Sequence, residues 1–433
     1  MQVAIVGTGY VGLPTGVVLA HIGHIVLCVD RDPAKVERIR GGSSPIHEPG
    51  TEDLLREGLA NGRFTATTDL TAAVRAAEVV ILAVGTPEGA DGYPDMTEFE
   101  NAALEVARAI DKPTLVVTKS TVPIGTGDRL QQLMLEAGVP EGQVFILSNP
   151  EFLQEGTAIK NSLQPDRVLI GGNNATAAQK LADMYAPLGA PVLITDRNSA
   201  ELIKYASNCF LATKISFINA VSRLCEMTGA DVGEVAKGIG MDQRINPHFL
   251  GAGLGWGGSC FPKDVSGLIK ISERMGYDFG LLREVVKIND EQALSFLNRV
   301  EKRLGSLEGK TIAILGLAFK PNTDDIRDSR SLVLIEEILK RGGAVQVYDP
   351  IAMTHVQRIF PDIRYTRDAY DAVDGADALI LATEWNDFRS LDLAAIAKRM
   401  KQPILFDGRR AVIRAAAEAS GLEYHTIGKR TMA

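Results

Sequence analysis

The chain reads V-A-I-V-G-T-G-Y-V-G from Val3 to Gly12, a short apolar run that leads directly into a G-x-G-x-x-G pattern. The apolar run predicts a buried strand, and a helix is expected to begin at the glycines. Glycine permits the tight turn, lets the backbone approach a pyrophosphate, and allows the helix to pack closely on the strand. The helix N-terminus would offer free N–H groups to the phosphates. The stretch therefore predicts a dinucleotide-binding unit at the start of the chain.

An acidic residue is expected to complete this site, and Asp30 closes the next apolar run, Ile25–Asp30, about 18 residues after Gly12. A carboxylate there binds ribose hydroxyls and repels a 2′-phosphate, which favours NAD over NADP. The alternative is a tight turn followed by an aspartate that only caps a helix. Two later loops, Gly85-Thr86-Pro87 and Thr118-Lys119-Ser120-Thr121, follow apolar runs. Because ligands of doubly wound sheets bind at the carboxyl ends of strands, both loops are predicted to border the cofactor.

Apolar runs alternate with amphipathic stretches at both ends of the chain, and the middle differs. The segment Ser199–Met227 contains neither Pro nor Gly and has apolar residues at helical spacing, and two more helical stretches follow at Val265–Met275 and Leu281–Leu304. We predict an α/β fold in which two Rossmann-like, doubly wound parallel-sheet domains are joined by a central helical domain with a long helix. The expected domains are residues 1–197, 198–305 and 306–433.

The composition limits the classes of function. Of the 433 residues, 45% are hydrophobic and 23% are charged, as in a globular protein, and the net charge of −8 argues against a nucleic-acid or anionic-membrane partner. The N-terminus lacks the pattern of a signal peptide, and no apolar run reaches the length of a membrane span, so we expect a cytoplasmic protein. The four cysteines form no C-x-x-C pair, so neither a disulfide framework nor a metal site is expected.

One cysteine stands apart from the other three, which lie in apolar or helical stretches and suit core packing. The segment from Gly251 to Asp264 reads G-A-G-L-G-W-G-G-S-C-F-P-K-D, and its small residues would let the backbone fold closely around a ligand. A helix is expected to start at or just after Pro262. Its N-terminus and the nearby Lys263 would both favour the thiolate of Cys260. We predict that Cys260 is a nucleophile, the alternative being a buried structural cysteine.

Two further groups of polar residues are candidates for chemistry. Lys204 and Asn208 have the i, i+4 spacing of one helix face, which Glu201 and Leu211 extend, and a Lys–Asn pair can hold an oxyanion. On its own such a pair also suits a solvated helix face. Glu151, in S-N-P-E-F-L-Q-E-G, follows an apolar run and could be a general base, or else a capping or surface acid.

Five motifs then identify a family. In order, they are G-T-G-Y-V-G-L-P, P-I-H-E-P-G, S-N-P-E-F-L-Q-E-G-T-A, G-G-S-C-F-P-K-D-V and F-K-P-N-T-D-D-I-R-D-S. Together they resemble the UDP-glucose/GDP-mannose dehydrogenase family over nearly the whole chain. The resemblance implies a four-electron oxidation of a nucleotide sugar at C6, from alcohol to carboxylate, with two NAD. The form of the cysteine motif favours conversion of UDP-glucose to UDP-glucuronate. The alternatives are the same chemistry on GDP-mannose or another nucleotide sugar, and a non-catalytic nucleotide-sugar-binding regulator.

The resemblance also implies a course for the two oxidations. Asp264 and Thr118 would assist, through water, in removing the hydroxyl proton during the first of them. Cys260 would trap the aldehyde as a thiohemiacetal, which the second oxidation turns into a thioester. A thioester explains the need for a cysteine, because it retains the aldehyde between the two oxidations.

The remaining implied roles concern the oxyanion, the hydrolysis and binding. Lys204 and Asn208 would hold the developing oxyanion, and Glu151 would assist hydrolysis of the thioester. Arg244 would reach the site of a partner subunit in a homodimer. The residues expected around NAD are Gly7, Gly9, Tyr10, Val11, Gly12, Asp30, Lys35, Thr86, Thr121, Glu155, Lys263 and Arg327. Those expected around the nucleotide sugar are Phe152, Leu153, Glu155, Lys204, Asn208, Arg244, Phe249, Leu250, Gly251, Gly253, Gly255, Gly257, Lys320 and Arg409.

Overall fold

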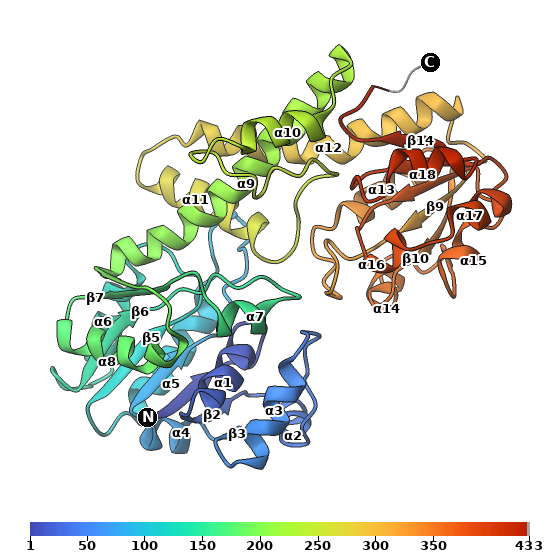
Figure 1. Ribbon diagram of the computed structural model, residues 1–433. Helices are drawn as coiled ribbons and strands as arrows, with labels where there is room; N and C mark the ends of the chain where they lie inside the picture. The colour runs from blue at the N-terminus through green and yellow to red at the C-terminus, as the bar shows by residue number, and fades with distance from the viewer. Residues whose placement is uncertain (431–433) are drawn as a thin grey trace. The chain divides into compact units, whose positions relative to one another are not determined.

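The structure is a computed structural model that describes residues 1–430 (Figure 1). The chain forms two compact units, one of Met1–Ser207 with Ser266–Tyr277 and the other of Asn208–Val265 with the chain from Asp278 onward. Two helices, α9 (Arg197–Thr228) and α11 (Phe261–Arg274), contribute residues to both units. The predicted class is confirmed, because each unit carries a largely parallel sheet and a 32-residue helix lies in the middle of the chain. The three domain boundaries stay a prediction.

The first unit is built on an eight-stranded sheet in the order β3-β2-β1-β4-β5-β6-β7-β8. In its centre Ile5 of β1 lies between Cys28 of β2 and Ile81 of β4, and all three side chains are fully buried. The strands are β1 (Gln2–Val6), β2 (Ile25–Val29), β3 (Phe64–Thr67), β4 (Val79–Leu82), β5 (Thr114–Thr118), β6 (Val144–Ser148), β7 (Val168–Gly172) and β8 (Val192–Thr195).

Helices cover both faces of this sheet, and each face has its own apolar core. Leu13 and Val17 of α1 belong to one core, whereas Phe99 of α5 and Leu130 of α6 belong to the other. This two-sided burial explains why the strands read as continuous apolar runs. The helices are α1 (Gly12–His21), α2 (Pro33–Arg40), α3 (Thr51–Ala60), α4 (Leu70–Ala76), α5 (Thr97–Ala109), α6 (Thr126–Glu136), α7 (Ala158–Leu163), α8 (Ala175–Tyr185) and the short 3₁₀ helix η1 (Ala186–Leu188).

One strand pair departs from the parallel pattern that the sequence predicts. β7 runs antiparallel to β6, with Leu147 opposite Gly172 and Ser148 opposite Gly171. A Cβ atom on Gly172 would lie 2.3 Å from the Leu147 side chain, and one on Gly171 would lie 2.5 Å from Ala200 of α9. The two glycines therefore let β6 and the start of α9 pack closely against β7.

The second unit is built on a six-stranded sheet in the order β11-β10-β9-β12-β13-β14, all parallel. The strands are β9 (Thr311–Leu315), β10 (Ala344–Tyr348), β11 (Arg364–Tyr365), β12 (Ala378–Leu381), β13 (Ile404–Asp407) and β14 (Glu423–Thr426). The remaining helices are α10 (Val232–Gly240), α12 (Gly280–Leu304), α13 (Arg330–Lys340), α14 (Met353–Gln357), α15 (Ala369–Val373), α16 (Asn386–Arg389), α17 (Leu393–Arg399) and α18 (Arg414–Ala419).

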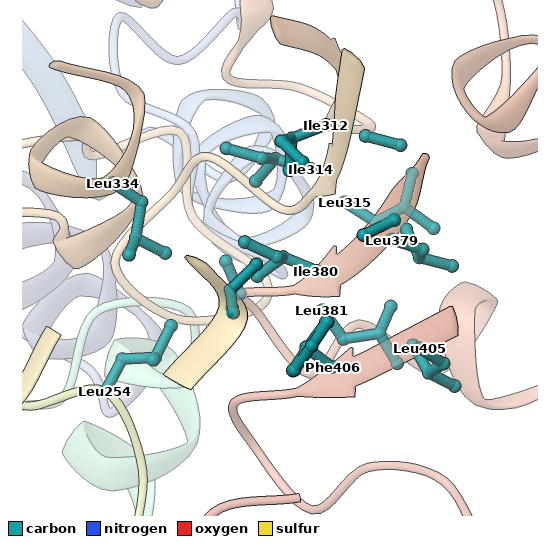
Figure 2. Close-up of a cluster of buried hydrophobic side chains, with 14 of the residues drawn as sticks. Leu254, Ile312, Ile314, Leu315, Leu334, Leu379, Ile380, Leu381, Leu405 and Phe406 are labelled. Carbon is teal, nitrogen blue, oxygen red and sulfur yellow. The ribbon is translucent and has the colours of Figure 1, made fainter. Parts of the chain in front are cut away.

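The core of this unit also anchors the segment that leads to Cys260. Figure 2 shows Leu254 together with buried side chains of β9, β12 and β13, and Leu254 is fully buried. Leu250 and Ala252 belong to the same cluster. Burying a leucine side chain contributes about 1.5–3 kcal/mol, so these contacts fix the path of the chain ahead of the cysteine.

Candidate active site

The glycines after β1 divide into two kinds. A Cβ on Gly7, whose φ is 101°, would lie 2.6 Å from the carbonyl oxygen of Ala83, and a Cβ on Gly12 would lie 2.0 Å from that of Gly7. These two glycines are required by the fold itself. Gly9 is exposed and nothing lies within 4 Å of its Cβ position, so its bare backbone is open to a ligand. The loop at the N-terminus of α1 thus fits a pyrophosphate.

Asp30 lies beside this loop, immediately after β2. One carboxylate oxygen accepts hydrogen bonds from the backbone N–H, at 3.2 Å, and the hydroxyl of Thr8, and Lys35 Nζ lies 4.0 Å away. Burial alone would raise the pKa of Asp30, but the hydrogen bonds from Thr8 and Asp32 outweigh it and the pKa is lowered. The residue that caps the next helix is Asp32, and not Asp30, because the Asp32 side chain accepts from Ala34 N–H at the start of α2. Asp30 is therefore an ionised acid beside the glycine loop.

The loops after β4 and β5 are joined to each other, as expected for two neighbours of one ligand. The hydroxyl of Thr86 donates to the carbonyl oxygen of Thr121 at 2.7 Å, and that of Ser120 donates to Val84 at 2.7 Å. The hydroxyl of Thr118 is buried and has no hydrogen-bond partner within residues 1–430. Buried polar atoms are rarely left unpaired, so this oxygen suits a water molecule or a substrate group.

Glu151 and Lys204 form a buried ion pair in the first unit. Lys204 Nζ on α9 lies 2.8 Å from Glu151 Oε1 and 2.8 Å from the carbonyl oxygen of Glu151, and the side chains are 3% and 7% exposed. Burial would raise the pKa of Glu151, but the charge and hydrogen bond of Lys204, the Leu153 N–H and the charge of Lys119 outweigh it, and the pKa is lowered. Glu151 is thus a buried carboxylate, and neither a helix cap nor a surface acid.

Cys260 immediately precedes α11 in the second unit and is partly exposed. Its Sγ lies 3.5 Å from the hydroxyl of Ser259, and its carbonyl oxygen accepts from the N–H of Asp264 at 3.0 Å, so the helical turn has formed. Asp264 is buried, and its Oδ2 accepts from Asn208 Nδ2 at 2.5 Å. Asp264 thus lies one helical turn after Cys260 and is hydrogen-bonded to Asn208 of α9.

The other cysteines suit packing, as predicted. Cys28, Cys209 and Cys225 are all buried. Burial raises the pKa of Cys209 to about 12, and the charge of Asp264 adds to the effect. A thiol with such a pKa stays protonated and unreactive.

The segment before Cys260, residues 249–260, is called here the cysteine loop. The sequence suggests that its small residues let the backbone fold around a ligand, but two of its glycines make close contacts with the protein itself. Cβ atoms on Gly255 and Gly257 would lie 2.7 Å from Asn289 Oδ1 and 2.2 Å from the carbonyl oxygen of Asp328. These glycines therefore let the loop pack on its own unit, whereas Gly251 has nothing within 4 Å of its Cβ position. Phe249 opens the loop with a φ of 62°, a conformation that bulky residues rarely adopt.

The cation next to Cys260 is not directed at sulfur alone. Lys263 Nζ is paired with Asp264 Oδ1. The ammonium charge is thus balanced by a carboxylate, and the support for a thiolate rests more on the N-terminus of α11 than the sequence suggests.

The other predicted substrate residues lie on two surfaces that belong to different units. In the first unit the guanidinium of Arg167 stacks on the ring of Phe152 at 3.6 Å. In the second, Arg409 donates to the carbonyl oxygens of Ala382 at 2.8 Å and Phe319 at 3.1 Å, and Phe319 precedes Lys320.

Two more predicted residues keep an accessible charge. Arg327 pairs with Asp325 at 2.7 Å with 56% of its side chain exposed. Arg244 pairs with Asp242 and is 89% exposed. Charges this exposed can exchange their present partner for a ligand at little cost.

Sequence reasoning missed the role of Glu201, which it placed only on the face of Lys204. Its Oε1 accepts from Gly127 N–H at 2.8 Å and its Oε2 from Gly125 N–H at 2.7 Å. These donors belong to the N-terminus of α6, so Glu201 caps that helix from α9. Ser148, the last residue of β6, also donates to it at 3.3 Å. Burial raises the pKa of Glu201 to about 7, against these hydrogen bonds.

We expect Glu201→Gln to lower the free energy of unfolding by about 1–3 kcal/mol, because an amide N–H would replace one of two acceptor oxygens and leave a buried backbone donor unpaired. Urea denaturation at neutral pH measures the effect. Glu105→Gln, at an exposed position of α5, is the matched control and should change little. Equal stability of the two variants would contradict the capping role.

The sequence also gave no signal for Lys119, Asn149 and Tyr185, which form a buried polar group behind Glu151. Lys119 was expected only as part of a cofactor loop. Its partners are about 30 and 66 positions away in the chain, and a pattern of local residues cannot reveal contacts of that range.

Within residues 1–430, no helix combines the length and apolar character needed to cross a membrane. The same residues contain no group of three or more His, Cys, Asp or Glu side chains placed to hold a metal ion.

Comparison with known proteins gives matches along the whole chain. Three parts of the UDP-glucose/GDP-mannose dehydrogenase family match in order: the NAD binding domain over residues 1–189, the central domain over 198–291 and the UDP binding domain over 313–414. The chain is 43% identical over 433 residues to UDP-glucose 6-dehydrogenase YwqF of Bacillus subtilis (strain 168), with 100% of this chain and 98% of that protein covered.

Solved structures agree with the sequence matches. A UDP-glucose dehydrogenase from the hyperthermophilic archaeon Pyrobaculum islandicum is 38% identical with a TM-score of 0.92, covering 99% of this chain and 98% of that one. A UDP-D-ManNAc dehydrogenase from Pyrococcus horikoshii is 30% identical with a TM-score of 0.87, covering 99% of each chain. Relatives named for different sugars thus share this fold, and sugar choice has to be argued from finer features.

Proposed function

The chain belongs to the UDP-glucose/GDP-mannose dehydrogenase family, and from that premise we propose that it oxidises UDP-glucose at C6 to UDP-glucuronate with two NAD. The observation that carries the proposal is the partly exposed Cys260 at the start of α11, one turn from the buried Asp264–Asn208 pair. A regulator without catalytic activity would have no need of this arrangement.

Bound NAD would supply the hydride acceptor for both oxidations. In the first, the C6 hydroxyl loses its proton as the C6 hydride leaves, which gives an aldehyde. Asp264 is a buried acceptor that suits a water molecule taking this proton. Thr118, whose hydroxyl has no hydrogen-bond partner within residues 1–430, is our candidate to assist the same proton transfer.

In the second oxidation, Cys260 Sγ forms a bond to the aldehyde carbon and the π electron pair of the C=O bond moves to oxygen. The oxygen takes up the proton released by the thiol and becomes the hydroxyl of a thiohemiacetal. Loss of a hydride and of the hydroxyl proton gives the thioester. Lys204 and Asn208 lie one turn apart on α9, and their N–H groups would stabilise negative charge on this oxygen. To do so, each would share its present bond to Glu151 or Asp264 with the substrate.

Hydrolysis completes the reaction. A water oxygen attacks the thioester carbon, the C–S bond breaks with its electron pair going to Sγ, and the proton of the water passes to a base. Glu151 is our candidate for that base, because it is a buried carboxylate whose lowered pKa keeps it ionised.

The sugar is tested by turnover of UDP-glucose, GDP-mannose and UDP-N-acetylglucosamine side by side. We expect UDP-glucose to be preferred and to yield two NADH per sugar with no free aldehyde. One NADH per sugar would overturn the thioester route, and faster turnover of GDP-mannose would move the proposal to the second sugar. Binding without NADH formation on any sugar would favour the regulator.

A homodimer is part of the proposal. Phe210, Phe217 and Leu224 recur every seven residues along α9 and are 66%, 55% and 57% exposed. Apolar residues at heptad spacing form a stripe along one helix face, which suits packing against the same stripe of a second copy. We expect Phe217→Asp to give a monomer in size-exclusion chromatography with light scattering, whereas Ile359→Asp, at another exposed apolar position, should not. A dimeric Phe217→Asp variant would contradict this interface.

Arg244 is proposed to serve the site of the partner subunit, which its high exposure permits. Two inactive variants, Arg244→Ala and Cys260→Ser, can be mixed and allowed to exchange subunits. If Arg244 acts across the dimer, each hybrid has one intact site, and about a quarter of the activity should return. No recovery would place Arg244 in its own subunit's site.

The same proposal covers the division into domains at residues 1–197, 198–305 and 306–433, and a cytoplasmic location. None of the four cysteines forms a disulfide, and the proposed nucleophile among them must stay reduced, which a reducing compartment ensures.

A further inference from the structure

Lys119, next to Thr118 at the end of β5, is a buried ammonium group that the proposed reaction does not yet use. It is 8% exposed, and its Nζ donates to Asn149 Oδ1 at 3.0 Å, to the carbonyl oxygen of Asn149 at 3.5 Å and to the Tyr185 hydroxyl at 3.5 Å. A buried charge is tolerated only when it is well paired. All of these residues lie in the first unit.

The partners of Lys119 hold the chain that carries Glu151. Asn149 accepts from the Tyr185 hydroxyl at 2.7 Å, its side-chain amide donates to the carbonyl oxygen of Leu169 at 2.8 Å, and its backbone N–H donates to that of Thr118 at 2.8 Å. These bonds fix both the side chain and the backbone of Asn149, two residues before Glu151. Lys204 fixes the other side of Glu151.

The charges of these groups act on one another. Burial lowers the pKa of Lys119 to about 8; the charge of Glu151 opposes the shift and that of Lys204 adds to it. At neutral pH Lys119 is therefore still mostly protonated, and its charge is one of those that lower the pKa of Glu151. The carboxylate thus has two buried cations in its surroundings.

A cavity of about 110 Å³ lies on this side of Glu151. The residues that line it include Lys119, Asn149, Glu151, Arg167 and Tyr185, all of which carry polar side chains. The volume is far below what a nucleotide sugar needs, but a water molecule occupies about 30 Å³ and requires two to four polar partners. The ligand that fits this cavity is water, the second reactant of the proposed hydrolysis.

We propose that Lys119 is a positioning residue for hydrolysis of the thioester, which holds Glu151 and the cavity beside it in the geometry that lets Glu151 take a proton from the attacking water. This inference rests on the proposed function. The water oxygen bonds to the thioester carbon, the electron pair of the C–S bond goes to Sγ, and the proton taken by Glu151 leaves through the water of the cavity. Lys119 itself touches neither the sugar nor NAD in this proposal.

The test separates the hydride transfers from the hydrolysis by rapid mixing of each variant with UDP-glucose and NAD. In Lys119→Met we expect a rapid burst of about two NADH per site, followed by steady turnover about 10- to 100-fold slower than in the unsubstituted chain. The thioester should accumulate and appear as an added mass on Cys260 in intact-protein mass spectrometry. Lys119→Arg keeps the charge and should restore part of the steady rate.

Two variants control for a merely structural effect. Lys112, just before the same strand, is half-buried and donates to the carbonyl oxygen of Ala76 at 3.2 Å. Lys112→Met should show neither burst nor slower turnover. Tyr185→Phe removes one partner of Lys119 without removing charge and should show a smaller burst; it carries the test if Lys119→Met fails to fold.

The outcomes are distinct. A slow steady rate without a burst and without the added mass, in both Lys119→Met and Tyr185→Phe, would overturn the role in hydrolysis, as would an unchanged steady rate. If the unsubstituted chain forms no NADH from UDP-glucose, the proposed function fails instead.

Discussion

Cys260→Ser should abolish turnover of UDP-glucose, lowering kcat by about three orders of magnitude or more while leaving sugar binding nearly unchanged. A serine hydroxyl is far less acidic than a thiol and is a poor nucleophile without an adjacent base. Cys260 lies just before α11, with the hydroxyl of Ser259 3.5 Å from its Sγ. NADH formation measures turnover, and titration calorimetry with UDP-glucose measures binding.

The matched control is Cys225→Ser, because Cys225 is a buried cysteine of α9. It should lower stability modestly, since a hydroxyl would enter an apolar core, yet leave turnover per folded molecule intact. Full activity of Cys260→Ser would rule out the thioester, whereas loss of activity together with loss of UDP-glucose binding would point to damage of the site as a whole.

Lys204→Met should have the second large effect, on both stability and activity. It would leave the carboxylate of Glu151 buried without its ion pair, which typically lowers the free energy of unfolding by about 3–5 kcal/mol. It would also remove the proposed oxyanion donor, which is expected to lower kcat by about 100-fold or more. Thermal unfolding and steady-state kinetics measure the two effects.

The double variant Lys204→Met with Glu151→Gln separates these effects. Neutralising the carboxylate should restore most of the lost stability, because no unpaired charge then stays buried. Activity should not return, since the oxyanion donor and the proposed base are both missing. If the double variant is as unstable as Lys204→Met, the ion pair is not what stabilises this region.

The features that the sequence predicted well are encoded locally. The glycine pattern after β1, Asp30 at the end of β2, and Cys260 at the start of α11 each follow from residues adjacent in the chain. Turn chemistry, strand ends and helix starts act over a few residues, so a single sequence contains enough information to predict them.

The partners of those features depend on long-range packing. The sequence predicted that Lys204 and Asn208 share a helix face, but it could not show that each is bound to a carboxylate, Glu151 and Asp264, more than 50 positions away. Likewise, β7 runs antiparallel to β6, and Gly171 and Gly172 leave room there for side chains of α9 and β6. Such pairings exist only once the chain has folded.

Glu201, Lys204 and Asn208 restrict which sequence changes residues 201–208 of α9 can accept. Each has a fixed partner, respectively the start of α6, Glu151 and Asp264. Outward-facing positions such as Leu202 can accept many side chains. Insertion of one residue between Glu201 and Asn208 would instead turn Asn208 by about 100° and move it by about 1.5 Å along the axis. Proteins that use this arrangement can therefore vary the surface of the segment freely, but its length has to be inherited unchanged.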